Sequence, residues 1–181
     1  MNRTIKTLAL AFAALALTAC ESRTDKTDGG GVLLSLSDFD GLPVVVSASG
    51  DCCNVAVETM TLQNIAKTPG GTTSDLMNVE IQSYEVVYTR EDTGTRVPPK
   101  LVQSIFGVVP VNGTSQLDNY PVMRTDQFNN VPIEDLLDYG YDRETGSTVI
   151  RLKFAVRFFG RTLSGDPVES APAYFSVEIV P

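Results

Sequence analysis

The sequence predicts an all-β fold, an antiparallel β-sandwich of seven to eight strands with one short helix. Apolar and polar residues alternate with a period of two in several segments, which is the pattern of a strand with one buried face. Glycine and proline clusters separate these segments at short intervals, as turns do. An up-and-down β-barrel is the alternative fold for the same pattern.

The alternation is clearest in the two segments nearest the C-terminus. In the segment 148–159, every second side chain from position 150 to position 158 is apolar, and three of the four residues between them are charged. Residues 160–172 contain two glycines and two prolines and should form the loop of a hairpin that leads to a last strand at 174–179. The side chains expected to face the core are Ile150, Leu152, Phe154, Val156, Phe158, Phe175, Val177 and Ile179.

Less regular segments supply the other strands and the helix. Pro132 suits the first position of a helix, and the glycine at position 140 ends it. Glu134 and Asp135 favour its positively charged N-terminal end. The remaining strands are expected at residues 32–36 and 44–48 (one or two short strands), 55–62, 79–90, 101–111 and 121–128, with Asn112 and Gly113 as the turn between the last two.

One of these strands adds a resemblance to a known family. Residues 81–88, Ile-Gln-Ser-Tyr-Glu-Val-Val-Tyr, have a Tyr-x-Val-x-Tyr core that resembles the third strand of fibronectin type III domains. The strand order, the late hairpin and the final strand, over most of residues 50–181, also resemble an immunoglobulin-like topology. The chain departs from that pattern because it has no tryptophan, and no cysteine pair that could join two sheets.

The first 20 residues have the layout of a secretory signal. Arg3 and Lys6 precede an apolar stretch that is too short for a membrane-spanning helix, which needs roughly 20 residues. The stretch ends in Leu17-Thr18-Ala19-Cys20, which resembles the lipobox of bacterial lipoproteins. The resemblance implies that residues 1–19 are removed and that the Cys20 thiol carries a diacylglycerol. The protein would then be held in the bacterial cell envelope, on the inner or outer membrane, with its body in the periplasm or at the cell surface.

The composition after Cys20 divides the mature chain into a tether and a body. Residues 20–31 should form a lipidated flexible tether, because they are polar and end in three glycines. Residues 32–181 have the usual size of one domain with one core. Without Arg3 and Lys6 the mature chain has 12 basic and 22 acidic residues, a formal charge of −10. That charge argues against nucleic acid as a partner, because nucleic acid requires a basic surface.

The residue types also argue against catalysis. The chain has no histidine, which removes the commonest general base and the commonest metal ligand. It also has no glycine-rich loop at the start of a helix, where phosphates are usually bound. We therefore expect a protein that is not an enzyme, with no catalytic residue and no cofactor.

Two acidic clusters raise the possibility of a calcium site. One contains Asp38 and Asp40, and the other consists of Glu134, Asp135, Asp138 and Asp142. Calcium requires six to eight oxygens that converge on one point, and neither cluster has a full set in its spacing. Ordinary polar surface and helix capping are the favoured interpretation, so no metal ligand is assigned.

Cys52 and Cys53 are the remaining unusual feature. With Cys20 lipidated they are the only thiols of the chain, in an oxidising compartment. Their Cα atoms are fixed about 3.8 Å apart, less than the roughly 4.4–6.8 Å of relaxed disulfides. Three interpretations stay open: reduced structural thiols with Cys53 facing inward, which is favoured, a strained vicinal disulfide, or a link to another protein.

Together these observations predict a lipid-anchored, non-catalytic structural or interaction module whose partner is another envelope protein. A lipoprotein that binds calcium or a small ligand is the first alternative. A redox accessory protein that uses Cys52 and Cys53 is the second. An exposed apolar strand edge, a convergent acidic pocket and an exposed thiol pair are the features that would distinguish the three.

Overall fold

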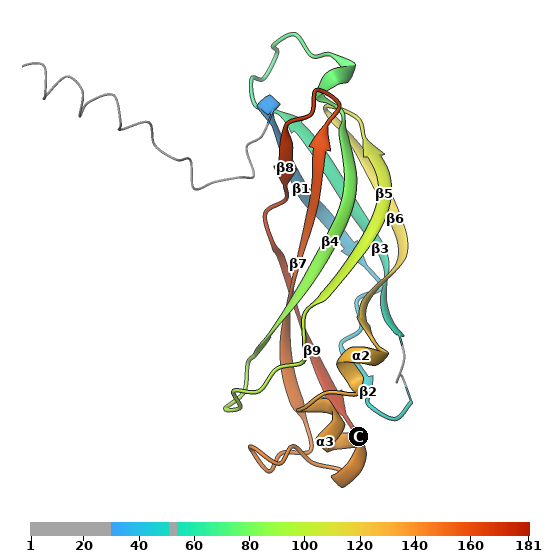
Figure 1. The fold of residues 1–181 in the computed structure, drawn as a ribbon, viewed down its shortest axis with the longest axis vertical. Helices are drawn as coiled ribbons and strands as arrows, with labels where there is room; N and C mark the ends of the chain where they lie inside the picture. Colours follow the sequence, from blue (N-terminus) through green and yellow to red (C-terminus); the bar gives the residue numbers. More distant parts are fainter. Residues whose placement is uncertain (1–29, 51–53) are drawn as a thin grey trace, which may run out of the picture.

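The computed structural model describes residues 30–50 and 54–181, which are predominantly β and form two sheets around one hydrophobic core (Figure 1). The helical elements are a short 3-10 helix, η2 (Asp75–Met77), and the helices α2 (Thr125–Phe128) and α3 (Ile133–Tyr139). The strands are β1 (Val32–Asp40), β2 (Val45–Ser47), β3 (Asn54–Ala66), β4 (Val79–Arg90), β5 (Leu101–Val109), β6 (Gly113–Arg124), β7 (Ile150–Thr162), β8 (Pro167–Glu169) and β9 (Ala173–Val180).

The two sheets differ in size and are joined by crossovers. One has the order β1-β3-β6, and the other has the order β2-β9-β7-β4-β5, with β8 paired to β7. The alternative expectation of an up-and-down barrel is wrong for the described residues, because strands that are not consecutive pair with each other, such as β3 with β6 and β4 with β7. The β2–β9 pair is parallel, which the prediction of an antiparallel fold did not include.

The predicted core face of β7 is confirmed, and that of β9 is confirmed except at Phe175, which is only partly buried. All five apolar side chains expected to face inward from β7 are fully buried, and so are Tyr84 and Val86 of β4. In β9, Val177 and Ile179 are buried, whereas Tyr174 on the other face is exposed. The period-two alternation therefore identified the buried face correctly wherever it was regular.

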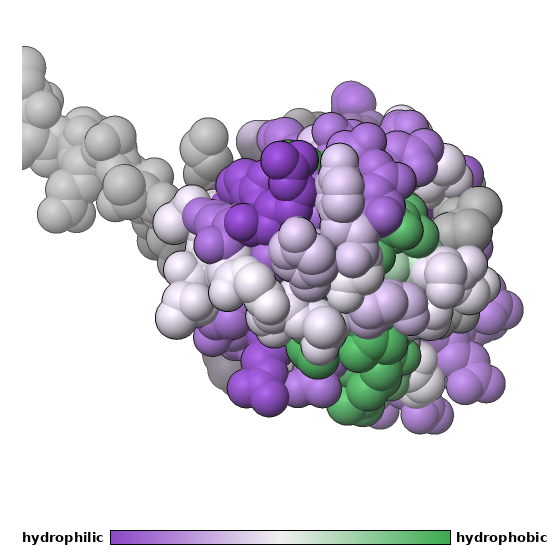
Figure 2. Space-filling model, turned by 90° about the horizontal axis from the view of Figure 1, so that it is seen from below, coloured by the Kyte–Doolittle hydropathy of each residue, from purple (hydrophilic) through white to green (hydrophobic). Residues whose placement is uncertain are grey.

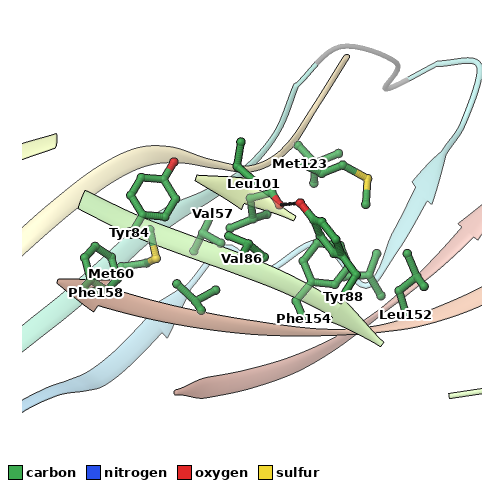
Figure 3. Close-up of a cluster of buried hydrophobic side chains, with 14 of the residues drawn as sticks. Val57, Met60, Tyr84, Val86, Tyr88, Leu101, Met123, Leu152, Phe154 and Phe158 are labelled. Atoms are coloured by element: carbon green, nitrogen blue, oxygen red, sulfur yellow. Dashed lines mark hydrogen bonds between the residues drawn. The ribbon is translucent and has the colours of Figure 1, made fainter. Parts of the chain in front are cut away.

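Aromatic rings fill the centre of this core (Figure 3). Tyr84 stacks on Phe158 with ring centroids 5.5 Å apart, and Tyr88 meets Phe154 edge to face at 4.9 Å. The hydroxyls of Tyr84 and Tyr88 each donate a 2.7 Å hydrogen bond to a backbone carbonyl of β6. Burial raises the pKa of both hydroxyls, so both tyrosines stay neutral. The two bonds link the large sheet to the small one.

Several predicted boundaries are wrong, since β1 and β3 each extend four residues beyond their predicted ends and two other segments differ more. Residues 121–128 were expected to form one strand, but β6 begins at Gly113 and the chain turns into α2 after Arg124. The side chain of Gln127 accepts a hydrogen bond from the Arg124 N–H and so caps this turn. Residues 160–172 are not only a loop, because β7 continues to Thr162 and β8 folds back onto it. The predicted short helix is confirmed as α3, which ends at Gly140 in the left-handed conformation (φ 76°).

The molecule is elongated, with its strands roughly along the long axis (Figure 1). The upper end in this view contains the start of β1, residues 66–78 with η2, the turn at 110–112 and the hairpin between β7 and β8. The lower end contains α3, residues 91–99 and 140–149, and the C-terminus. Among the helices in the described parts of the chain, none is long and apolar enough to cross a membrane.

Candidate functional site

Four of the acidic residues at the lower end form a cluster with two arginines, and they are Asp92, Asp135, Asp142 and Glu144. The Arg90 guanidinium lies 2.8 Å from Asp142 and 2.6 Å from Asp92. Arg96 donates to Asp135 at 2.7 Å and to the other oxygen of Asp142 at 3.0 Å. The side chain of Asp142 is fully buried, and that of Arg90 is 3% exposed. This arginine–carboxylate cluster joins the end of β4, the 91–99 segment, α3 and the 140–149 segment.

The contacts within the cluster hold Asp142 and Glu144 in the ionised form. Burial alone would raise the pKa of Asp142, but hydrogen bonds from Arg90, the Glu144 N–H and the Thr145 hydroxyl lower it to about 2. Glu144 accepts hydrogen bonds from the Thr95 hydroxyl and from the backbone N–H groups of Thr95 and Arg96, and these lower its pKa to about 2 as well. The Arg90 guanidinium thus compensates a charge on Asp142 that burial would otherwise penalise.

The four acidic residues of the predicted second cluster therefore do not converge on one point. Asp135 and Asp142 meet arginines, whereas Glu134 and Asp138 are exposed on α3. Asp38 and Asp40 are exposed at the end of β1, where Asp40 accepts a hydrogen bond from the Gly41 N–H. No group of three or more His, Cys, Asp or Glu side chains in residues 30–50 and 54–181 is arranged to hold a metal ion.

The three cysteines cannot be placed in this fold. Cys20, Cys52 and Cys53 lie outside the described residues, and so does the predicted signal segment. The interpretations of the lipid anchor and of the thiol pair remain predictions.

A pocket of about 260 Å³ lies between β2 and β3. Among the described residues its lining consists of Pro43, Val45, Val46, Asn54, Val55 and Ala56, of which only Asn54 has a polar side chain. Backbone groups and the Asn54 amide make much of the accessible lining polar, although most of the lining side chains are apolar.

Strand β5 carries the most exposed large apolar side chain in the described residues, Phe106, which is 76% exposed. Val102 and Val108, on the same face of the strand, are 58% and 41% exposed. We call these three residues the β5 strip. Among the described strands, β5 is the last one of the large sheet and pairs only with β4. The strip therefore exposes three apolar side chains along one edge of the fold, with the exposed Ser104 between Val102 and Phe106.

The surroundings of the β5 strip are mixed in character. On β4, Val87 is 37% exposed, and Glu85 is the register partner of Val102. The ammonium group of Lys100 lies 3.3 Å from the Glu85 carboxylate beside the strip. The sequence alone did not identify this surface, because residues 101–109 are apolar on both faces and their alternation does not say which face is buried.

Comparison with known proteins adds little. No family model matches the chain, and no curated protein does. Among solved structures, the solution structure of a candidate late embryogenesis abundant (LEA) protein is similar, with 13% sequence identity and a TM-score of 0.44. The alignment covers 97% of this chain and 88% of that one. A likeness of this size carries no conclusion about the function of this chain.

Proposed function

We propose that this protein is a lipid-anchored envelope protein whose folded body is a non-catalytic interaction module. The exposed apolar β5 strip is the observation that supports the interaction role. Large exposed apolar side chains grouped on one strand are uncommon on proteins without partners. The partner proposed is another envelope protein that presents an apolar segment to the strip.

The strand order supports an immunoglobulin-like assignment of the fold as part of this proposal. Strands β1, β3 and β6 would correspond to A, B and E, and strands β9, β7, β4 and β5 to G, F, C and C′. Immunoglobulin-like sandwiches share an architecture that serves many functions, and binding by strands and loops is frequent among them. The fold therefore suits an interaction module without specifying its partner.

The anchor is supported by the Leu17-Thr18-Ala19-Cys20 run. We expect the wild-type protein to partition into detergent and to yield an acylated N-terminal peptide that begins at residue 20, whereas Cys20→Ser should accumulate as the unprocessed precursor. Intact-mass spectrometry of the purified protein measures both results. An unmodified mature chain in the wild type would contradict the lipid anchor.

The interaction role is tested by a photo-crosslinking amino acid placed at Phe106 in the membrane-bound protein. We expect a discrete protein adduct at this position, because a partner that covers the β5 strip must contact its most exposed side chain. The matched control is the same amino acid at Gln116, an exposed position of β6 in the other sheet, where no adduct is expected.

A second variant ties the adduct to the strip. Val102→Asp combined with Val108→Asp should abolish the adduct at position 106, because each change places a charge in an apolar contact. Equal adducts at positions 106 and 116, or none at either in folded and acylated protein, would contradict the proposal.

A further inference from the structure

Two exposed leucines lie close together at the upper end of the molecule. Leu76 in η2 is 58% exposed, and Leu163 in the hairpin after β7 is 47% exposed. The Leu163 N–H donates to the Asn78 carbonyl at 2.9 Å, and the Ser164 N–H donates to the Leu76 carbonyl at 3.0 Å. These backbone hydrogen bonds join η2 to the hairpin, so both leucines belong to one surface.

The N-terminal segment meets the folded body at the same surface. A Cβ atom on Gly30 would lie 2.6 Å from Cγ2 of Thr162 and 3.1 Å from Asp166, so the backbone of Gly30 packs directly against the hairpin. Gly30 has a φ of +61°, a conformation that favours glycine. The chain that leads back to Cys20 therefore joins the body next to Leu163.

Charge differs between the two ends of the molecule. At the upper end, residues 66–78, 110–113 and 161–167 contain two basic and two acidic side chains, a net charge of zero. At the lower end, residues 91–99 and 129–149 contain seven acidic and two basic side chains, a net charge of −5. Figure 2 shows the lower end, where hydrophilic and intermediate residues cover most of the surface and hydrophobic ones form smaller, separate areas. An anionic lipid surface would repel the lower end but not the upper end.

We infer that the upper end docks on the surface of the lipid bilayer, with Leu76 and Leu163 entering the interfacial region. This inference rests on the proposed anchor at Cys20 and adds a folded contact to it. The tether from Cys20 to Gly30 reaches at most about 36 Å, so the upper end stays close to the membrane. Because the tether makes docking intramolecular, two leucines suffice where a free protein would need a larger apolar surface.

The chain contains no tryptophan, so a single introduced tryptophan reports its own surroundings. Acylated Leu163→Trp protein is reconstituted in vesicles of equal parts phosphatidylethanolamine and phosphatidylglycerol, with dibrominated phosphatidylcholine as the quencher. We expect the brominated lipid to quench the fluorescence of the tryptophan at position 163. Leu137→Trp, on α3 at the lower end, is the matched control and should keep its fluorescence. In the Leu163→Trp protein, a further Leu76→Asp change should remove the quenching while the melting temperature stays unchanged, because Leu76 is exposed.

Two outcomes would overturn the inference, and they can be told apart. Acylated protein in which both tryptophans are quenched equally, or in which neither is quenched, overturns the docking and leaves the anchor intact. Wild-type protein whose intact mass shows no acyl chain overturns the anchor, and the docking with it. If another protein and not lipid covered Leu76 and Leu163, neither tryptophan would be quenched.

Discussion

Replacing Phe154 with alanine should lower the free energy of unfolding by about 3–5 kcal/mol, the usual range for the loss of a buried ring that leaves a cavity. Phe154 is fully buried in the middle of β7. Its ring packs between Tyr88 of β4 at 4.9 Å and Phe175 of β9 at 5.0 Å, and these three residues are also register partners across the sheet. Because rings on both sides contact it, neighbouring side chains cannot easily fill the space.

Denaturant unfolding of the purified protein measures this loss, with Arg151→Ala as the control. Arg151 is on the same strand but faces solvent, with its side chain 63% exposed in an ion pair with Glu178. Exposed ion pairs contribute little, so we expect a change of less than about 0.5 kcal/mol. Equal losses in the two variants would show that the faces of β7 have been assigned incorrectly.

Replacing Asp142 with asparagine should also cost about 3–5 kcal/mol, the usual penalty for removing one partner of a buried ion pair. Asparagine has nearly the same size but no negative charge. Among the described residues, the buried positive charge of Arg90 is then balanced by Asp92 alone. Asp138→Asn is the matched control on α3. Asp138 is exposed, so its substitution should change stability by less than about 0.5 kcal/mol.

The same cluster predicts how stability depends on pH. The pKa of Asp142 is lowered from 3.8 to about 2 in the folded state, so its contribution is fully present above pH 4 and is lost as the pH falls towards 2. The difference in unfolding free energy between wild-type protein and Asp142→Asn should therefore shrink across this window, as measured by denaturant melts at stepwise pH. A difference in unfolding free energy that stays constant from about pH 6 to about pH 2 would contradict the lowered pKa assigned to Asp142.

The sequence predicted strands well where one face is buried along the whole element. In β7, alternation is regular from Ile150 to Phe158, and burial follows it. In β6, residues 113–120 contain a single large buried aliphatic side chain, Leu117, so the pattern gave no strand there. Pairing with β3 over the whole length of β6 supplies what the local sequence lacks.

The candidate site was less predictable, because it depends on contacts between distant segments. The acidic residues at 134–142 were visible in the sequence, but nothing in their spacing indicates that Arg90 and Arg96 would meet Asp135 and Asp142. Strand β5 was predicted, but its exposed face was not, because apolar residues occupy both of its faces. Which face is covered depends on the opposing sheet, and that information is not local.

The parallel β2–β9 pair has a mechanical consequence. The described chain starts at one end of the long axis and finishes at the other, so tension between the two ends runs along the strands (Figure 1). This tension would load the backbone hydrogen bonds between β2 and β9 in shear. The register pairs Val45 with Glu178 and Ser47 with Val180. At the two ends of the pair, the Glu178 N–H donates to the Val44 carbonyl and the Ala48 N–H donates to the Val180 carbonyl. Bonds loaded in this way share the force and must break together, whereas a strand peeled from one end loses them one at a time. The C-terminal strand is thereby secured against a pull directed along the long axis of the molecule.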